Sequence, residues 1–491
     1  MRRISIDNFG LNNGKRDDVF FPAKKRRKGW CAASPKLFTT LLCFIVWYCW
    51  SQTSGSKYEI PEDNFAYVDD PSLVDILNST LGFEKILVLN LPFRTDRRDA
   101  MTLSAATSNI HLDFLDGVTG DSIKPSAYPP PQENQKLQAG IRGSWRTHMN
   151  ALQTIISQNL TTALIMEDDV DWDIRIRQNL QRFAIASRFL SGGDGETPSL
   201  DLDQKFAIQH RPNTETAENS FKILTEHTMV EKTLPSLPLT SAYAFSQSSS
   251  SSSSSSSTQQ QHRSKSTPHS PYGNPANWDI LWIGHCGAGF PRSSSPSSSS
   301  SSNDPPSTPL SNIILTQPND STVPTTHHLK AHPFQGTLDP LASAYPPHTR
   351  IFHRATGGQL CTVAYAVSQR GARRLLHQFA TKGWNGIFDA ELGRWCAGED
   401  PDMGDQKKRE GKMKNKERER VCLTSQPPIF AHHHPQQGES DIGGLGGGYA
   451  KKYETKYLRL SVRMNLERIV EGGGREEFVD QWPDEGGQVV G

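Results

Sequence analysis

The sequence lacks the short motifs that mark several common classes of protein. It contains no CxxC pair, no nicotinamide-type glycine fingerprint, no P-loop and no HExxH string, so zinc-site, redox, NTPase and metalloprotease functions lack support. Hydrophobic residues are scarce, at 35% of 491 residues. The formal net charge of +1 argues neither for nor against a polyanionic partner, and no nucleic-acid partner is expected.

The polar excess is concentrated in three stretches of the chain. Residues 191–275 include ten consecutive serines, and residues 292–347 are rich in Ser, Pro and Thr. Residues 403–420 are dominated by Lys, Arg and Glu, where a solvated insertion is favoured over a charged helix. Such segments bury too little apolar surface to offset the entropy of ordering them. We therefore predict one folded domain over residues 84–470 with three disordered insertions, followed by a disordered tail over residues 471–491.

The N-terminal region has the order of a signal anchor. The basic string KKRRK at residues 24–28 precedes fourteen uncharged, mostly apolar residues at 37–50. By the positive-inside rule, this order predicts a cytosolic tail (1–36), a transmembrane helix (37–53) and a lumenal stem (54–83) that leads to the domain. A cleaved signal peptide and a nuclear localisation signal are the alternatives. The expected location is the Golgi or endoplasmic reticulum membrane, in a single-pass type II topology.

Two further features are consistent with a lumenal domain. Sequons for N-glycosylation begin at Asn78, Asn159 and Asn319. Four cysteines lie beyond the predicted anchor, and they allow three disulfide pairings among which the sequence does not choose: Cys286, Cys361, Cys396 and Cys422.

Hydrophobic periodicity predicts alternating strands and helices in the folded part. Such alternation is typical of an α/β fold with a mostly parallel sheet between layers of helices. Strands are expected at residues 85–91, 111–118, 162–167 and 278–286, at the start of 362–376 and at 427–430, with helices at 95–108, 140–158, 174–190 and the end of 362–376.

An acidic motif follows one of the predicted strands. The apolar run Leu164–Met166 leads directly into Glu167, Asp168 and Asp169. Open α/β sheets bind ligands at the carboxyl ends of their strands, and clustered carboxylates hold hard divalent cations that can neutralise a nucleoside diphosphate. The motif therefore suggests a nucleotide-sugar transferase. The alternative is a solvated turn in which Asp169 or Asp171 caps the next helix.

Five sequence blocks in a fixed order resemble glycosyltransferase family 25, the lipopolysaccharide and collagen galactosyltransferase-like family. The blocks are NLPFRTDRR (90–98), GSWRTHMNAL (143–152), LIMEDDV (164–170), WDILWIG (278–284) and TVAYAVSQRGARRLL (362–376), and the polar insertions with HHHPQQGESDIGG are similar to fungal members. The resemblance implies a GT-A-like (Rossmann-like) fold and inverting transfer of a hexose, with galactose as the default, from a UDP-sugar to a glycan or glycoprotein acceptor.

The same resemblance assigns candidate metal ligands. It places Glu167 and Asp169 at the metal-binding position, with Asp169 as the first choice for direct contact, and leaves Asp168 for the ribose or donor sugar. The histidine cluster, through His433, is expected to supply a third ligand to Mn²⁺ or another divalent cation, unless it is a solvated polar loop.

The donor-binding residues are expected after the first strand and on the helix that precedes the acidic strand. Asn90, Arg94, Arg97 and Arg98 follow or end the first strand, where guanidinium groups could meet phosphate or uridine. His148 matches a position that the family fills with histidine. The alternatives are exposed arginines on a helix and a structural histidine.

An inverting transferase also needs a general base that accepts the proton of the acceptor hydroxyl. Asp389, in GIFDAELGRW, matches an acid of the family and is the first candidate, with Glu391 and His285 as alternatives. Asp389 could instead be the N-cap of a short helix.

Two other classes of protein remain open. One is a lumenal binding protein with a degenerate transferase fold, which would lose the acids. The other is a membrane-tethered structural protein with a serine-rich, O-glycosylated stalk.

Overall fold

The computed structural model describes residues 70–131, 136–192, 234, 236–251, 270–291, 313–329, 340–399, 419–435, 440–442 and 454–484. The chain divides into two units, Met1–Ile60 and Pro61–Gly491, and every described residue belongs to the second. The predicted cytosolic tail, the predicted anchor at 37–53 and most of the predicted stem lie outside the described residues. No helix in the described ranges combines the length and the apolar character needed to cross a membrane.

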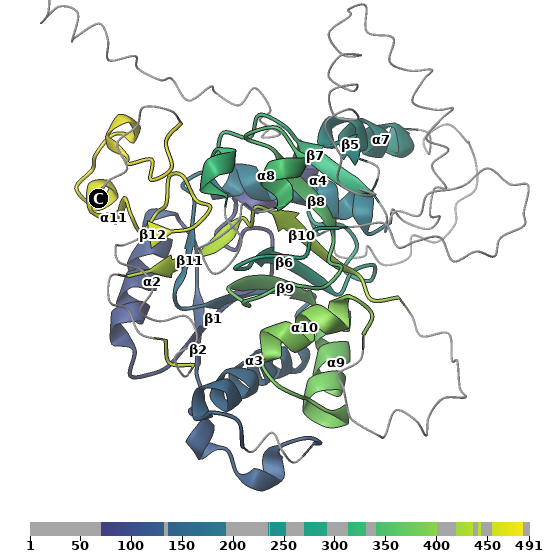
Figure 1. The fold of residues 1–491 in the computed structure, drawn as a ribbon, viewed down its shortest axis with the longest axis vertical. Coiled ribbons are helices and arrows are strands. Elements are labelled where there is room, and N and C mark those ends of the chain that lie inside the picture. Colours follow the sequence, from purple (N-terminus) through teal and green to yellow (C-terminus); the bar gives the residue numbers. More distant parts are fainter. Residues whose placement is uncertain are drawn as a thin grey trace, which may run out of the picture. The chain divides into compact units, whose positions relative to one another are not determined.

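A mixed β-sheet forms the centre of the domain (Figure 1). Its main path runs β2 (Asp113–Asp116), β1 (Lys85–Asn90), β3 (Thr162–Glu167), β9 (Ala364–Ser368), β6 (Ile280–Gly284), β10 (Cys422–Gln426), β8 (Arg350–Arg354), β7 (Ile314–Gln317) and β5 (Ser236–Pro238). β1 is parallel to β2 and β3, β9 is antiparallel to β3 and β6, and β6 is parallel to β10. Off this path, β11 (Phe430–His434) pairs with β6, β4 (Val170–Trp172) and β12 (Glu454–Thr455).

Helices cover both faces of this sheet because alternate residues of its strands point to opposite sides. On β3, Leu164 and Met166 enter one hydrophobic core, whereas Ala163 and Ile165 enter the other. The first core is covered by α2 (Thr95–Thr107), α4 (Ile176–Leu190) and α7 (Leu239–Ser251), and the second by α3 (Ala139–Ser157), α9 (Gln369–Leu376) and α10 (Phe388–Cys396). Two shorter helices are α8 (Pro340–Ala344) and α11 (Leu466–Val470). The predicted GT-A-like α/β class is confirmed.

The helix α3 is held close to the loop that will form one wall of the site. A Cβ atom at Gly143 would lie 2.3 Å from the carbonyl oxygen of Val118, so only glycine permits this approach. One turn later, the Thr147 hydroxyl accepts a hydrogen bond of 2.8 Å from the Val118 amide. On its other side, Trp145 stacks on Trp384 with ring centroids 4.6 Å apart. These contacts fix α3 and the loop after β2 relative to each other.

The folded domain extends beyond the boundaries expected from composition. Leu73 and Ile76, within the predicted stem, are fully buried, and Gln481, within the predicted tail, donates a hydrogen bond of 2.8 Å to the carbonyl oxygen of Thr455. The regions predicted as insertions at 191–275 and 292–347 contain β5, α7, β7 and α8. Short apolar runs, such as Ile313–Leu315, are buried there even though the surrounding composition is polar.

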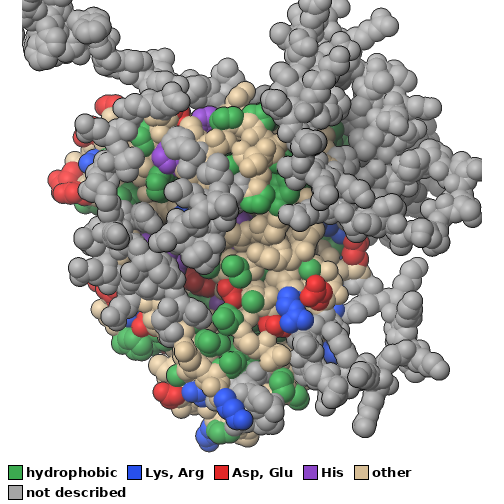
Figure 2. Space-filling view, in the orientation of Figure 1, with side chains coloured by type: hydrophobic (Ala, Val, Ile, Leu, Met, Phe, Trp, Pro, Cys, Tyr) green, Lys and Arg blue, Asp and Glu red, His purple; other side chains and the backbone are tan. Residues whose placement is uncertain are grey.

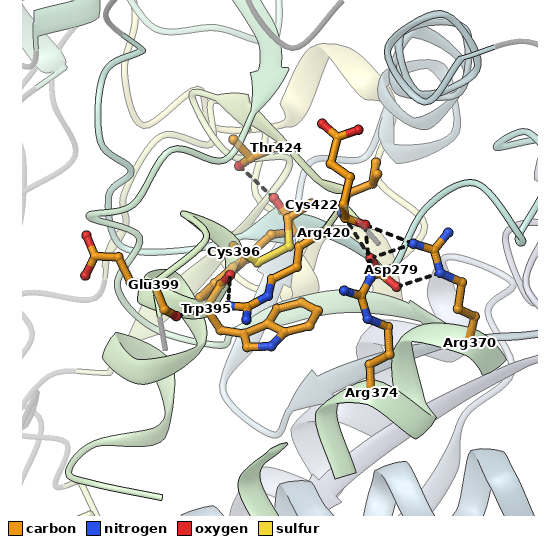
Figure 3. Close-up of a disulfide and its surroundings, with 12 residues drawn as sticks. Asp279, Arg370, Arg374, Trp395, Cys396, Glu399, Arg420, Cys422 and Thr424 are labelled. Atoms are coloured by element: carbon orange, nitrogen blue, oxygen red, sulfur yellow. Dashed lines mark hydrogen bonds and ion pairs between the residues drawn. A yellow bond between two sulfur atoms is a disulfide. The ribbon is translucent and has the colours of Figure 1, made fainter. Parts of the chain in front are cut away.

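Two disulfides join the four cysteines of the domain, as Cys286–Cys361 and Cys396–Cys422. The second disulfide links the end of α10 to the start of β10 (Figure 3). This pairing is one of the three that the sequence left open. Persistent disulfides are typical of an oxidising compartment such as the secretory lumen.

A buried charge network ties the region after β7 to the rest of the domain. The fully buried Asp320 accepts hydrogen bonds from Arg182 of α4 (3.0 Å) and Arg350 of β8 (2.8 Å). Burial alone would raise the pKa of Asp320, but the charges of Arg350 and Arg182 outweigh burial and lower it. The carboxylate is therefore ionised at neutral pH.

We expect the substitution Asp320→Ala to lower the free energy of unfolding by about 3–5 kcal/mol, because it leaves two arginines buried without their anion. Chemical denaturation of the full chain at neutral pH measures this loss. The matched control is Asp75→Ala, at an exposed acid, which should change stability by no more than about 0.5 kcal/mol. Equal effects of the two substitutions would contradict the placement of residues 313–329 in the folded domain.

Candidate active site

A cavity of about 530 Å³ opens at the carboxyl ends of β1 and β3. This is the edge at which open α/β sheets bind ligands. In Figure 2, acidic, histidine and hydrophobic side chains lie near one another toward the middle of the face shown. The cavity walls include Asn90, Phe93, Arg97, Gly117–Asp121, Ser144, Thr147, His148, Glu167–Asp169, Cys286, Leu360–Thr362, Ile387–Ala390, His432, His434 and Ser440–Ile442.

Glu167, the last residue of β3, and the two acids that follow it have different sets of partners, although Asp168 and Asp169 share Arg97. Glu167 Oε1 accepts a hydrogen bond of 2.7 Å from the Thr362 hydroxyl. Asp168 accepts one from Asn90 (2.8 Å) and one from Arg97 (2.7 Å). Asp169 Oδ2 lies 2.8 Å from Arg97 Nη1 and 2.8 Å from His432 Nε2. The expected alternative, an acidic helix cap, is wrong because the N-cap of α4 is Arg175.

Burial and neighbouring charges shift the pKa values of Asp168, Asp169 and His432 in different directions. Burial would raise the pKa of Asp169, but the charges of His432 and Arg97 lower it well below its usual range. For Asp168, burial and then the charge of Asp169 raise the pKa. Burial would lower the pKa of His432, but the charge of Asp169 outweighs this and raises it. Asp169 is therefore the firmly ionised carboxylate of the motif.

Asp169 also has an oxygen that could bind a cation. Its Oδ1 atom is buried and makes no hydrogen bond to any described residue. His432 lies on the Oδ2 side of the same carboxylate. The described residues contain no group of three or more His, Cys, Asp or Glu side chains placed to hold a metal. The predicted set of Glu167, Asp169 and His433 is thus not assembled among the described residues. A cation at Asp169 would need most of its ligands from substrate or water.

The choice of His433 within the histidine cluster was wrong. The cluster lies inside β11 and not in a loop after it, so successive side chains point to opposite faces. His432 and His434 line the cavity, with ring centroids 4.4 Å apart. His433 Nδ1 instead lies 3.0 Å from the Thr455 hydroxyl, which donates to the buried Asp171. A period of two applied to the strand would have selected His432.

The residues predicted to bind the donor fall into two groups. Asn90, Arg97, His148 and Asp168 all line the cavity. Arg94 forms an ion pair with Asp441, which is itself part of the cavity wall.

The prediction for Arg98 was wrong. Its side chain is exposed on α2, and its guanidinium carbon lies 4.3 Å from the ring centroid of Phe114. The alternative of an exposed helix arginine therefore applies to this residue alone among the three.

Of the candidate bases, only Asp389 lines the cavity. It accepts hydrogen bonds from the backbone amides of Cys361 (2.7 Å) and Ala390 (2.6 Å). It is not an N-cap, since α10 begins at Phe388 and its N-cap is Ile387.

The two alternative bases are held elsewhere. Glu391 is buried, and its Oε1 accepts a hydrogen bond of 3.1 Å from Arg394. His285 Nε2 lies 2.9 Å from the carbonyl oxygen of Ser425, and burial lowers the pKa of His285 to about 4. Neither residue belongs to the cavity wall.

Comparison with known proteins agrees with this arrangement. Residues 83–270 match the family model described as Glycosyltransferase family 25 (LPS biosynthesis protein). Over these residues the chain is similar to glycosyltransferase family 25.

Curated relatives match shorter parts of the chain. Procollagen galactosyltransferase 1 of Danio rerio is 23% identical over 171 residues, which cover 33% of this chain and 27% of the relative. Inactive glycosyltransferase 25 family member 3 of Homo sapiens is 27% identical over 150 residues, which cover 28% of this chain and 24% of the relative. The chain thus spans about a quarter of the length of these relatives.

Several residues in and around the cavity were not singled out by sequence reasoning. Thr362 holds Glu167, and its hydroxyl lies 3.2 Å from His148 Nε2. Tyr365 places its hydroxyl 2.8 Å from His148 Nδ1. The contacts of His148 are thus those of a structural histidine, the alternative given above, although the residue also lines the cavity. Contacts between residues 195 or more positions apart leave no local pattern in the sequence.

We expect Arg97→Gln to destabilise the folded domain by about 2–3 kcal/mol at neutral pH, because Asp168 and Asp169 lose the guanidinium group that they share. Divalent Mn²⁺ should restore part of the loss by replacing that positive charge. Thermal unfolding with and without Mn²⁺ measures both effects. Arg98→Gln is the matched control and should cost at most about 1 kcal/mol, the worth of an exposed cation–π contact. Indistinguishable behaviour of the two variants would contradict the ion pairs described.

Proposed function

We propose that the chain is a glycosyltransferase that moves a hexose from a UDP-sugar to a hydroxyl group of a glycan or glycoprotein, with inversion and with help from a divalent cation. One observation carries this proposal. A single cavity at the carboxyl ends of the strands contains both an ionised carboxylate with an unbonded oxygen, on Asp169, and a second, half-buried acid, Asp389.

The charge of the cavity supports dependence on a metal. Arg97 is the only Lys or Arg among the described residues that form its wall, whereas six carboxylates do so: Asp121, Glu167, Asp168, Asp169, Asp389 and Asp441. A nucleoside diphosphate entering this wall alone would be repelled. A divalent cation between Asp169 and the diphosphate would reverse that repulsion.

The cation we propose is Mn²⁺ or a similar ion, held by Asp169 and His432. When bound, such an ion stabilises the negative charge of a leaving nucleoside diphosphate. Asn90 and Asp168, joined by a hydrogen bond, lie at the same edge of the sheet and are suited to donor hydroxyl groups. Arg97 lies within reach of the same region and supplies a further positive charge.

Asp389 is suited to the role of general base. Burial raises the pKa of its carboxyl group, and the charge of Glu167 raises it further, which brings a carboxylate closer to the pKa of an efficient base near neutral pH. In the proposed step the acceptor hydroxyl gives its proton to Asp389. Its oxygen then bonds to the anomeric carbon as the bond from that carbon to the UDP oxygen breaks, which inverts the configuration.

Donor sugar, acceptor and location also belong to this proposal. Galactose is supported by the names of relatives, which include procollagen galactosyltransferases, and these names are compatible with a glycoprotein acceptor. The two disulfides support a lumenal location for the domain, in the Golgi or endoplasmic reticulum, with the predicted anchor in the membrane.

A second candidate is a binding protein that keeps the donor cavity without turnover. The observation that favours it is the similarity to a relative named as inactive. This candidate would bind a UDP-sugar with a metal and release no UDP. The acids of the cavity are all present here, which favours the enzyme.

The test is release of UDP from UDP-galactose and other UDP-sugars by the full-length chain, with and without Mn²⁺. We expect metal-dependent release that falls by about 100-fold or more in Asp169→Ala, because the cation loses its charged ligand. The control Asp99→Ala, at an exposed acid of α2, should match the wild type. Metal-dependent binding of UDP without release would select the binding protein, and neither binding nor release would contradict both candidates.

A further inference from the structure

One disulfide is connected through two consecutive residues, Cys361 and Thr362, to two acids of the cavity, Asp389 and Glu167. The amide of Cys361 donates the 2.7 Å hydrogen bond to Asp389 Oδ2. The hydroxyl of the next residue, Thr362, donates the 2.7 Å hydrogen bond to Glu167 Oε1. Cys361 is covalently joined to Cys286, and both cysteines line the cavity.

Cys286 attaches Cys361 and Thr362 to the sheet. It lies two residues after the end of β6, the strand that pairs with β9, β10 and β11. Two backbone hydrogen bonds flank the disulfide, from the Cys286 amide to Leu360 (2.8 Å) and from the Leu360 amide to Gly287 (3.1 Å). The segment that carries the donors of Asp389 and Glu167 is thereby attached to the centre of the sheet.

The backbone of Cys361 needs this attachment. Its φ angle is +66°, in the left-handed region that residues other than glycine seldom adopt. Such a conformation persists only where the surrounding structure imposes it. The disulfide acts directly on this residue, whereas the flanking hydrogen bonds act on its neighbour.

We propose that the Cys286–Cys361 disulfide is a positioning element of the active site, which holds the Cys361 amide against the proposed base Asp389 and the Thr362 hydroxyl against Glu167. The inference rests on the proposed function, because it assigns Asp389 its role as base. It adds that catalysis, and not only stability, depends on this disulfide.

Loss of the disulfide has a defined consequence for Asp389. Its carboxylate faces Glu167 on β3 and His148 on α3, and it accepts hydrogen bonds from the amides of Cys361 and Ala390. The Cys361 amide favours the ionised form and so lowers the pKa against the effect of burial. Without that amide the pKa rises further, so a higher pH is needed to ionise the base.

The experiment compares the full-length wild type with the double substitution Cys286→Ser/Cys361→Ser. We expect kcat for UDP-galactose hydrolysis to fall by about 10- to 100-fold, the effect of a misplaced catalytic group. The affinity for UDP with Mn²⁺ should stay within about twofold, because Asp169 and His432 are not attached to this segment. The acidic limb of the pH profile of kcat should move to higher pH.

The second disulfide provides a matched control, Cys396→Ser/Cys422→Ser. It is joined to the C-terminal end of α10, the helix that carries Asp389 in its first turn. That end is also held by Trp395, which lies beside Arg374 and Arg420 (Figure 3). The centroid of its ring is 5.3 Å from the guanidinium carbon of Arg374 and 5.0 Å from that of Arg420. This control should lose thermal stability and keep the pH profile of the wild type.

A pair of single substitutions tests the same inference should the double variant fail to fold. Thr362→Val removes the hydroxyl that holds Glu167 and preserves both the shape and the disulfide, so kcat should fall while binding of UDP with Mn²⁺ is retained. Thr362→Ser keeps the hydroxyl and should restore most of the activity.

The possible outcomes distinguish the proposed function from the positioning role of the disulfide. A wild type that neither binds nor hydrolyses any UDP-sugar would defeat the proposed function itself. A wild type that turns over, with a pH profile and kcat unchanged in Cys286→Ser/Cys361→Ser or in Thr362→Val, would overturn the positioning role alone. Equal shifts of the pH profile in both double-serine variants would also overturn it, since the effect would then belong to general loosening of the domain.

Discussion

The cost of burying negative charge governs how this domain is built. Four aspartates follow β3 within six residues, Asp168, Asp169, Asp171 and Asp173, and all are buried. Buried carboxylates are tolerated only where cations or hydrogen-bond donors compensate them. The donors come from distant parts of the chain, so this short acidic segment gathers α2, β11 and the C-terminal region around itself.

The same requirement explains why the C-terminal region is ordered. Asp171 accepts hydrogen bonds from the hydroxyls of Thr455 and Ser461, and Asp173 accepts one from the amide of Leu460 (3.0 Å). Arg463 adds hydrogen bonds to the carbonyl oxygens of Asp168 (2.8 Å) and Val170 (2.9 Å). Residues 454–463 are therefore part of the support of the acidic segment, and the side chains of Gln481 and Trp482 in turn donate hydrogen bonds to the carbonyl oxygen of Thr455.

Asp169 and Asp171 differ in how many of their carboxylate oxygens accept hydrogen bonds. Both oxygens of Asp171 accept hydrogen bonds, from Trp172 and Arg463 on one side and from Thr455 and Ser461 on the other. Asp169 has two cationic partners on Oδ2 and no partner among the described residues on Oδ1. A carboxylate that is fully bonded has no capacity for a ligand, whereas Asp169, a residue of the cavity wall, retains one oxygen without a hydrogen bond to the described residues. Composition and spacing do not distinguish these two residues.

The spacing of apolar residues was sufficient to predict those parts of the fold in which buried residues recur at regular intervals. The strands β1 and β3, the helix α3 and the acidic motif at the end of β3 were all predictable, because buried strands and amphipathic helices have regular apolar spacing. Composition misled where short apolar runs lie inside polar stretches, as at β7. Arg97 and Arg98 were both predicted to bind the donor, and what distinguishes Arg97 is a partner 71 residues away. The choice between His432 and His433 depended on extending β11 through the histidines.

The central claim is that the cation of this site binds between Asp169 and His432. The most direct measurement is an anomalous difference map, collected at the manganese absorption edge from crystals of the protein grown with UDP and Mn²⁺. The account predicts one peak in the cavity, within coordination distance of Asp169 Oδ1 and a nitrogen of His432. A peak coordinated by Glu167 or His433 in their place, or UDP bound in the cavity with no manganese peak beside it, would contradict the account.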